Sequence, residues 1–488
     1  MKRRQLEKLG LPGDLARIAK WLISDAPHHD LTHAEARARV AAIAKDPEPH
    51  IDDPYFGDLA KAMRRRLIAD ERAKLGPQLQ DPPAPWKQWV DDLDPKCVEQ
   101  MKQACRLPVV VGAALMPDAQ LDFGLPSGGV LATDNAVIPN AVGMDIACGM
   151  KLSVFDLPVG ALTGQRDRLE RAIEVETRFG AGAEFQGRPR AHDVLDEDWD
   201  ISPITKQHKD KAHRQLGTSG GGSHFAEFGV LTITGDSNAS DSAAGERNAN
   251  EPATGELALA PGEYLALLTH SGSRGVGAAV ASYYSRLAAD LHPELPRDLR
   301  ELAWLELDEM EGQEYWQAME LMGRYAAANH ALMHHHIARQ LGADVIAGVE
   351  NHHNFAWKEE HDGREVIVHR KGATPAGDGV LGVIPGSMAS PGFVVRGKGS
   401  PAALRSASHG AGRVMSRTQA RQTYRWSQVR DLLDQQGVDL ISAGIDEAPF
   451  VYKDIHGVMA NQTDLVDIIA QFDPKLVKMA PEGERPED

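Results

Sequence analysis

A proline-rich stretch, "GPQLQDPPAPW" at residues 76–86, divides the chain into two parts with different hydrophobic patterns. Before it, "GDLARIAKWLI" and "PYFGDLAKAMRRRLIADERAKL" place apolar residues three or four positions apart, which predicts helices. After it, short apolar runs such as "LPVVVGAALM", "GEYLALLTH" and "EVIVHR" predict buried strands. Helical patterns alternate with these runs at residues 166–179, 275–291 and 310–341. We therefore predict a helical N-terminal extension over residues 1–85 and a mixed α/β domain over residues 86–480.

Two acidic segments interrupt or end this pattern. Residues 235–256, "GDSNASDSAAGERNANEPATGE", are small and polar, which predicts a mobile loop inserted between two strands. Residues 481–488, "PEGERPED", predict a frayed acidic tail.

The net charge of −17 is unevenly distributed along the chain. Of the 53 Lys and Arg and the 70 Asp and Glu, residues 1–90 hold 16 and 13, which leaves 37 against 57 in the rest. This balance argues against a main domain that holds nucleic acid by a broad basic surface. A polyanion bound there must be met by a local basic cluster or by metal ions.

Cysteine content and hydropathy indicate the compartment. Cys97, Cys105 and Cys148 are too few for a disulfide framework. The chain contains no run of roughly 18 apolar residues, and its basic N-terminus lacks the apolar region of a secretory signal. We therefore predict a cytoplasmic protein that does not associate with membranes.

Seven segments place metal-binding or polar side chains beside glycines, mostly directly after predicted strands. They are "LMPDAQLDFGLPSGGV" (115–130), "VGMDIACGMK" (142–151), "QLGTSGGGSHFAEFG" (215–229), "LLTHSGSRGVG" (267–277), "VENHHNFAW" (349–357), "VIVHRKGATPAG" (366–377) and "SHGAGRVMSR" (408–417). Glycines in such places let a ligand approach the backbone closely.

Four of these segments offer candidate metal ligands, and three of them hold Asp145 with Cys148, His224, and His270. In "DIACG", a turn can direct Asp145 and Cys148 at one point, although a lone cysteine after a strand is more often buried and inert. His224 follows three glycines and fits either a loop-capping histidine or a metal or phosphate ligand. His270 precedes "SGSRG", whose N–H groups, hydroxyls and Arg274 suit an anion.

Strand alternation limits the roles of neighbouring residues. Of His352 and His353, at most one can face a shared site, because successive side chains of a strand point to opposite faces. The same alternation directs Arg370 away from Lys371, and Gly372 favours close approach of a ligand beside that lysine.

A histidine pair on a predicted helix has a different interpretation. His330 and His334 are four positions apart, a spacing that can bind a metal. No further ligand pattern accompanies them, so we predict that they lie on a solvent-exposed helix face.

The strand-end residues together form one donor set. Its members are Asp145, Cys148, His224, His270 and one of His352 and His353. These oxygen, sulfur and nitrogen donors suit a transition metal such as Mn, Zn or Co. They exceed what one tetrahedral ion needs, whereas two ions that share a bridging thiolate would use them all. Such a centre beside Ser, Gly, Arg and Lys loops is typical of phosphoryl and nucleotidyl transfer. The residue types leave His409 open as a nucleophile, a metal ligand or a turn residue.

From about residue 95 to about residue 480, the chain resembles the RtcB family of RNA-splicing ligases. The motifs that carry this resemblance are "DIACGM", "GGGSHF", "HSGSRG", "HN", "HRKGAT", "PGSM" and "HGAGR", in this order. It implies an RtcB-like core with a metal centre in a central cleft. It also implies a ligase, dependent on GTP and two Mn²⁺ ions, that joins RNA 2′,3′-cyclic phosphate or 3′-phosphate ends to 5′-hydroxyl ends in RNA repair or splicing. An activating accessory protein is a further partner that the resemblance allows.

The resemblance also implies roles for single residues. His409 would attack the α-phosphate of GTP and carry GMP. The residues that would contact phosphates or the leaving group are Asp118, Arg274, Lys371 and Arg413. The residues that would bind the nucleotide are Ser223, Glu227, Ser387, Met388, Gly410, Ala411 and Gly412. The metal ligands would be Asp145, Cys148, His224, His270 and His353, with Cys148 bridging two ions. His353 is preferred to His352 because it directly precedes Asn354, as in the "HN" motif.

Several positions depart from the family pattern. Ser223 replaces an asparagine, Gln120 and Asp122 replace the histidine and glycine of "PDxHxG", and Ala389 follows "PGSM". The chain ends in "PEGERPED", where the family ends in Lys-Gly with a lysine that helps to recognise guanine. Two alternatives therefore stay open. One is a nucleotidyl transferase that modifies or caps phosphate ends, with altered nucleotide choice and without sealing. The other is an inactive, metal-stabilised RNA-binding homologue.

Overall fold

The computed structural model of the chain describes residues 2–187, 189–234 and 253–484. It divides into two compact units. The first comprises Met1–Gln78 with Leu287–Ala303, and the second comprises Leu79–Arg286 with Trp304–Asp488. The first unit thus includes a segment from the middle of the chain, which the hydrophobic pattern of residues 1–85 does not reveal.

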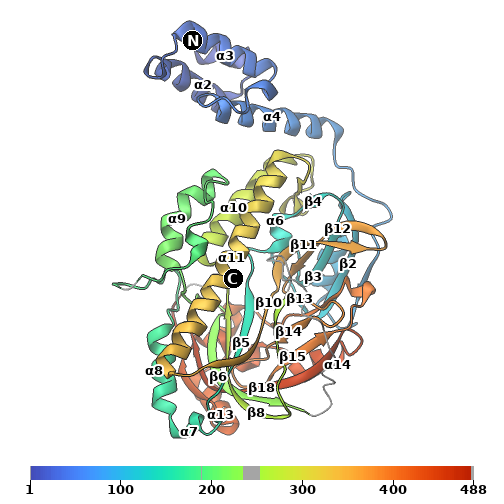
Figure 1. The fold of residues 1–488 in the computed structure, drawn as a ribbon. Coiled ribbons are helices and arrows are strands. Elements are labelled where there is room, and N and C mark those ends of the chain that lie inside the picture. Colours follow the sequence, from blue (N-terminus) through green and yellow to red (C-terminus); the bar gives the residue numbers. More distant parts are fainter. Residues whose placement is uncertain (1, 188, 235–252, 485–488) are drawn as a thin grey trace. The chain divides into compact units, whose positions relative to one another are not determined.

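The N-terminal part of the first unit is helical. Its helices are α1 (Arg3–Glu7), α2 (Gly13–Asp25), α3 (His33–Lys45) and α4 (Gly57–Leu75), with 3₁₀ turns at Ala26–His29 and Glu48–His50, and the later segment adds Arg300–Leu302 (Figure 1). A capping box begins α3, because Thr32 accepts the N–H of Glu35 and the Glu35 carboxylate accepts the N–H of Thr32. Leu15, Val40 and Phe56 are buried in the core that the helices share.

A five-stranded sheet forms one part of the second unit. Its order is β1 (Trp86–Gln88), β2 (Val110–Gln120), β3 (Ser127–Thr133), β12 (Arg364–Lys371) and β11 (Asn354–His361). The first two strands are parallel and the others pair antiparallel. Val130, Val368 and Ile384 contribute to the core on this sheet.

A nine-stranded sheet forms the other part. Its main order is β14 (Leu381–Ile384), β15 (Gly392–Gly397), β18 (Val466–Met479), β6 (Phe225–Ile233), β8 (Gly262–Ser271), β5 (Gly149–Phe155), β10 (Val345–His352) and β7 (Ala253–Glu256), and β17 (Asp439–Ser442) pairs with β18. Two short ladders join β13 (Ala373–Pro375) to β16 (Ser406–Ser408) and β4 (Ala136–Val137) to β9 (Leu305–Glu306).

Helices pack against the nine-stranded sheet. The helices of the second unit are α5 (Pro95–Ala104), α6 (Pro139–Val142), α7 (Ala161–Gly164), α8 (Arg166–Glu176), α9 (Pro203–Gln215), α11 (Met310–Leu341), α12 (Arg417–Thr423), α13 (Trp426–Gln436) and α14 (Ile455–Ala460), whereas α10 (Arg274–Leu291) begins in the second unit and ends in the first. Ile173 of α8 and Ile337 of α11 pack with Phe228 and Leu267 of the sheet. Helix α11 therefore packs against β8.

The mixed α/β class and the three predicted helical segments are confirmed, since α8, α10 and α11 lie within or over those ranges. Residues 253–256 of the predicted loop form β7, and residues 235–252 and 485–488 lie outside the described residues. The prediction of an exposed histidine pair is wrong: His330 and His334 are 0% and 2% exposed, because the sheet covers their face of α11.

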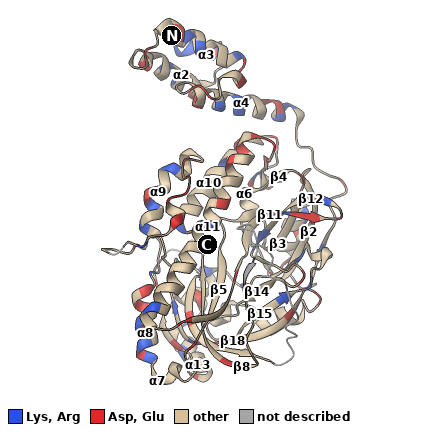
Figure 2. Cartoon of the chain, viewed as in Figure 1, with Lys and Arg blue, Asp and Glu red and all other residues tan. Residues whose placement is uncertain are grey.

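Basic and acidic residues occur together on the helices of the second unit. Figure 2 shows Lys and Arg together with Asp and Glu along helices such as α8 and α9. Within the described residues, none of the helices has the length and apolar character needed to cross a membrane.

Candidate metal and nucleotide site

Four candidate metal ligands lie at the same end of four neighbouring strands in the nine-stranded sheet. The order of these strands is β6, β8, β5 and β10. His224 and Cys148 directly precede β6 and β5. His270 lies near the end of β8, and His353 directly follows β10. Because neighbouring strands are antiparallel, the first residues of two strands and the last residues of the other two lie side by side.

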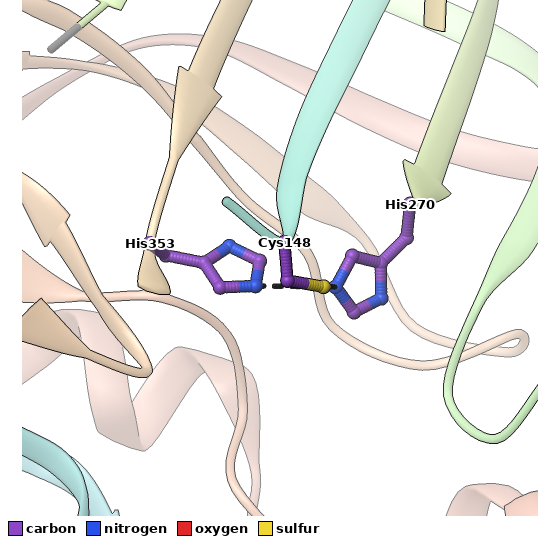
Figure 3. Close-up of side chains that lie close together, drawn as sticks. All are labelled: Cys148, His270 and His353. Atoms are coloured by element: carbon purple, nitrogen blue, oxygen red, sulfur yellow. Dashed lines mark hydrogen bonds between the residues drawn. The ribbon is translucent and has the colours of Figure 1, made fainter. Parts of the chain in front are cut away.

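The candidate ligand side chains converge on the thiol of Cys148. Its Sγ atom lies 3.1 Å from Nε2 of His270 and 3.3 Å from Nε2 of His224. His353 completes one group, with 3.2 Å between its Nε2 and that of His270, as Figure 3 shows for these residues. Asp145 completes a second group, with Oδ2 3.0 Å from Nε2 of His224. Cys148 belongs to both groups, and the ligand atoms within each group all lie within 4.8 Å of one another.

Burial and charge favour the forms of these residues that bind metals. Burial, together with the neighbouring His409 and His270, holds the pKa of His353 well below its ordinary value, so its ring is neutral. Burial raises the pKa of Asp145, but His224 and Arg274 outweigh it and leave the pKa lowered, so the carboxylate is ionised. His353 Nδ1 is buried without a hydrogen-bond partner in the described residues. A neutral imidazole, a carboxylate and a thiol that converge in a buried site fit a transition metal.

The turn that carries Asp145 and Cys148 is held by Asn354. The Asn354 carbonyl accepts the N–H of Ala147 at 2.7 Å, and its side-chain amide donates to the Asp145 carbonyl at 3.3 Å. The amide oxygen of Asn354 also accepts the N–H of Gly372 at 2.8 Å. The asparagine of the "HN" motif therefore links the ligand turn to the segment after β12.

His409 lies directly after β16, and its ring is held by Asp118. The Asp118 Oδ2 atom is 2.7 Å from Nδ1 of His409, while the Asp118 side chain is 0% exposed and that of His409 is 21% exposed. Because a carboxylate accepts hydrogen bonds, this contact favours the tautomer with the proton on Nδ1, in which Nε2 has a free lone pair. The His409 and His353 rings lie 5.0 Å apart, centroid to centroid.

A pocket of about 790 Å³ opens beside His409 and the metal-ligand cluster. All seven residues predicted to bind the nucleotide line it: Ser223, Glu227, Ser387, Met388, Gly410, Ala411 and Gly412. His409, Arg413, His270 and His353 line the same pocket. Its lining combines polar and apolar side chains, as the lining of a small-molecule site does.

Gly412 shows why this loop needs glycine. Its φ is +73°, and a Cβ there would lie 2.1 Å from the carbonyl oxygen of Asp118. The same loop carries His409, so the close approach of residue 412 to residue 118 sets the position of the histidine.

Other predicted site residues lie outside the lining of the pocket. Arg274 is buried, with Nη1 3.2 Å from Nδ1 of His224. The Lys371 ammonium donates to the Leu125 carbonyl at 3.1 Å and lies 3.0 Å from Oδ2 of Asp122. Burial lowers the pKa of Lys371, and Asp122 opposes this shift. The lining also does not include Asp118, Asp145, Cys148 or His224, which make the contacts described above.

Sequence reasoning missed several lining residues, among them Phe225, Glu447, Tyr452 and Met479. Glu447 is 3% exposed on its side chain and lies 3.2 Å from Nη1 of Arg413, and it also accepts the hydroxyl of Tyr452. One signal was present: "GIDEAPF" has an acidic pair after a glycine and follows a short apolar run, as do the segments that were singled out.

Glu227 differs from the other acidic residues of the site. It is 5% exposed on β6, it lines the pocket, and no hydrogen bond or ion pair joins its carboxyl group to a described residue. Burial raises the pKa of Glu227 to about 8. The pocket therefore presents an uncharged carboxyl group near neutral pH.

Comparison with known proteins identifies the family. A family model described as tRNA-splicing ligase RtcB matches residues 100–201 and 186–479. The RNA-splicing ligase RtcB of Escherichia coli (strain K12) is 31% identical over 421 residues, which cover 79% of this chain and 95% of that protein. The tRNA-splicing ligase RtcB of Nanoarchaeum equitans (strain Kin4-M) is 30% identical over 453 residues, which cover 78% of this chain and 90% of that protein. The tRNA-splicing ligase RtcB of Thermococcus kodakarensis (strain ATCC BAA-918 / JCM 12380 / KOD1) is 28% identical over 463 residues, or 78% and 92% of the two chains. The chain therefore belongs to the RtcB family.

Proposed function

We propose that this chain is a GTP- and manganese-dependent RNA ligase that works through a histidine–GMP intermediate on His409. The observation that carries the proposal is the position of His409. Asp118 holds its ring so that Nε2 keeps a lone pair, and the ring lines a pocket that His270 and His353 also line. A candidate nucleophile, a candidate metal cluster and a pocket lined by the residues predicted to bind the nucleotide therefore share one site.

The geometry supports a three-step reaction. Nε2 of His409 would form a bond to the α-phosphorus of GTP while the bond from that phosphorus to the bridging oxygen breaks and pyrophosphate leaves. The guanylate would then pass to the 3′-phosphate of one RNA, after a 2′,3′-cyclic end has been opened by water. Finally the 5′-hydroxyl oxygen of a second RNA would attack that phosphate and release GMP.

Residues of this chain would support each step. Asp118 would orient His409 and stabilise the charge that its ring gains, and Arg413 would contact phosphates from the pocket wall. Arg274 and Lys371 would reach a phosphate only after leaving their present contacts. Manganese bound by Asp145, Cys148, His224, His270 and His353 would act as a Lewis acid toward phosphate oxygens.

A second candidate is a nucleotidyl transferase with a different nucleotide choice that modifies phosphate ends without sealing them. Ser223 favours it, because this pocket-lining residue replaces the asparagine of the family pattern. The two candidates share the chemistry at His409 and differ in the nucleotide and in the fate of the RNA ends. The cytoplasmic location stays a prediction.

Intact-protein mass after incubation with Mn²⁺ and each of the four NTPs tests both candidates. We expect wild type to gain one GMP and His409→Ala to gain nothing. His456→Ala is the matched control, because His456 is an exposed histidine on α14, and it should behave as wild type. A gain of another nucleotide would select the second candidate. No adduct with any nucleotide would refute both. Ligation of a 3′-phosphate RNA to a 5′-hydroxyl RNA then separates sealing from end modification.

A further inference from the structure

A buried series of hydrogen bonds joins β8 to α11 directly behind the candidate metal cluster. Thr269 Oγ1 lies 2.8 Å from Nδ1 of His330 and 2.8 Å from Nε2 of His334. His334 Nδ1 lies 2.7 Å from Oγ of Ser153, and His330 Nε2 lies 3.1 Å from the carbonyl oxygen of Ser271. These five residues are at most 3% exposed.

The hydrogen-bond series and the metal-ligand cluster lie on opposite faces of β8. His270 lines the pocket, whereas its neighbour Thr269 contacts α11, as strand alternation requires. Leu267 follows the same alternation and packs with Ile337 of α11. The side chain that would bind metal and the side chain that holds the strand are therefore adjacent in sequence.

One carbonyl group determines the direction of every hydrogen bond in the series. Burial lowers the pKa of His330 to about 4 and that of His334 well below its ordinary value, so both rings are neutral and each carries one proton. The Ser271 carbonyl can only accept, so His330 donates to it from Nε2 and accepts the Thr269 hydroxyl at Nδ1. Thr269 then accepts from Nε2 of His334, whose Nδ1 accepts the Ser153 hydroxyl. Each donor has an acceptor, and no second arrangement satisfies the Ser271 carbonyl.

Asn329 makes a second link from the same helix. Its amide donates to the carbonyl of Gly272 at 2.9 Å, and its side-chain oxygen accepts the N–H of Gly217 at 2.7 Å. The Ser271 hydroxyl donates to the Ser219 carbonyl at 3.0 Å. Helix α11 therefore holds both the end of β8, which carries His270, and the glycine loop that leads to His224.

The loop beyond β8 connects these links to a third ligand. The N–H of Ser273 donates to Oδ1 of Asp145 at 3.0 Å. A shift of residues 271–273 would thus move His270 and the contact that orients Asp145 together. Outer partners of metal ligands usually matter in this way, since their loss costs about 10- to 100-fold in metal affinity.

We propose that Thr269, Asn329 and His330 are positioning residues that hold His224, His270 and Asp145 in a metal-binding arrangement. They touch neither substrate nor metal, and they act by tying two ligand-bearing segments to one rigid helix. The inference rests on the proposed function only in that the cluster binds a divalent metal.

Thr269→Val tests the proposal with little change in side-chain shape. It removes the hydroxyl and leaves Nδ1 of His330 and Nε2 of His334 without partners. We expect the Kd for Mn²⁺, measured by electron paramagnetic resonance of free Mn²⁺, to rise about 10- to 100-fold. We expect full transfer of GMP to His409 to return at saturating Mn²⁺, which a general loss of folding would not permit. Thr269→Ser should restore an affinity close to that of wild type, and His335→Gln, at an exposed position of α11, is the matched control. If Thr269→Val does not fold, His330→Phe carries the same expectation.

Hydrogen exchange of the metal-free proteins separates this inference from the proposed function. We expect faster amide exchange in residues 270–274 of Thr269→Val than of wild type, with α8 unchanged. An unchanged Mn²⁺ affinity in Thr269→Val would overturn the inference. If wild type binds no Mn²⁺, the proposed function fails, and exchange then decides: equal rates in residues 270–274 would overturn the positioning role as well.

Discussion

One oxygen atom of Asp118 holds His409 at two points and the next residue, Gly410, at a third. Oδ2 lies 2.7 Å from the ring Nδ1 of His409, 3.1 Å from its backbone nitrogen and 3.3 Å from that of Gly410. Asp118 precedes His409 by 291 positions and belongs to β2 of the five-stranded sheet. A single carboxylate therefore sets the tautomer, the ring orientation and the backbone position of the candidate nucleophile.

Asp118→Asn should slow nucleotide transfer to His409 without weakening metal binding. An amide cannot stabilise the positive charge that the ring gains, and it allows the other tautomer. Loss of the carboxylate partner of a catalytic histidine costs up to about 10⁴-fold in other enzymes, and we expect about 10²- to 10⁴-fold here. Single-turnover charging with GTP measures the effect. Asp464→Asn, which alters an exposed carboxylate bonded to Trp89, should leave the rate unchanged. A loss below about tenfold in Asp118→Asn would contradict an orienting role.

Gly412→Ala should displace His409, because the added methyl group would clash with Asp118 in addition to straining the backbone. Gly412 and Gly437 both have positive φ, +73° and +62°, but a Cβ at residue 412 meets the Asp118 carbonyl at 2.1 Å, whereas one at residue 437 meets nothing within 4 Å. We expect Gly437→Ala to lower the free energy of unfolding by about 1 kcal/mol and to keep full charging. Gly412→Ala should lower the rate of GMP transfer to His409 by at least about tenfold, and it should also lower the free energy of unfolding. Equal charging by the two variants would show that the clash is relieved without moving the histidine.

The pH dependence of stability should reveal the buried carboxyl group of Glu227. Its pKa is about 8 in the folded protein against an ordinary 4.5, so between about pH 5 and 8 the folded state keeps a proton that the unfolded chain has lost. Rising pH therefore lowers the free energy of unfolding, by about 1.4 kcal/mol per pH unit for this one group. Urea unfolding from pH 5 to 8 should show this slope in wild type and lose it in Glu227→Gln.

Glu263→Gln is the control for that measurement, since residue 263 is exposed, and it should retain the wild-type slope. An identical slope in wild type and Glu227→Gln would mean that Glu227 finds a partner that stabilises its charge.

Cys148→Ser should remove most of the stabilisation that Mn²⁺ gives. Cys148 is shared by both donor groups, so its loss would weaken two ions at once. A ligand present at 100 times its Kd stabilises a protein by about 2.7 kcal/mol, and we expect a rise in Tm of wild type with Mn²⁺ that EDTA reverses. Cys105→Ala is the control, because Cys105 is not a member of either donor group and burial raises its pKa to about 12, so it stays a thiol. A full Mn²⁺ response in Cys148→Ser would exclude the thiolate as a bridging ligand.

The sequence predicted much of the candidate site because its ligands are short-range features of strand ends. Alternation allowed at most one of His352 and His353, and the order "HN" selected His353, which is the one in the cluster. The histidine pair of α11 shows the limit of such reasoning. Spacing told us that His330 and His334 share a helix face, but exposure depends on which element covers that face. The same limit explains why sequence reasoning missed Glu447 and Tyr452. Their contacts with Arg413 join separate segments of the chain, which only the tertiary structure brings together.

By itself, the amino-acid sequence determined the family, the mixed α/β class and the residue types available for chemistry, since each depends on local pattern and motif. Only the tertiary structure decided which side chains meet. Asp118 meets His409, and α11 meets the back of β8, because two sheets and a long helix fold together over separations that no local pattern records. Burial followed from the same packing, and burial is what neutralises Glu227, His330 and His353 and so determines what each can donate, accept or bind.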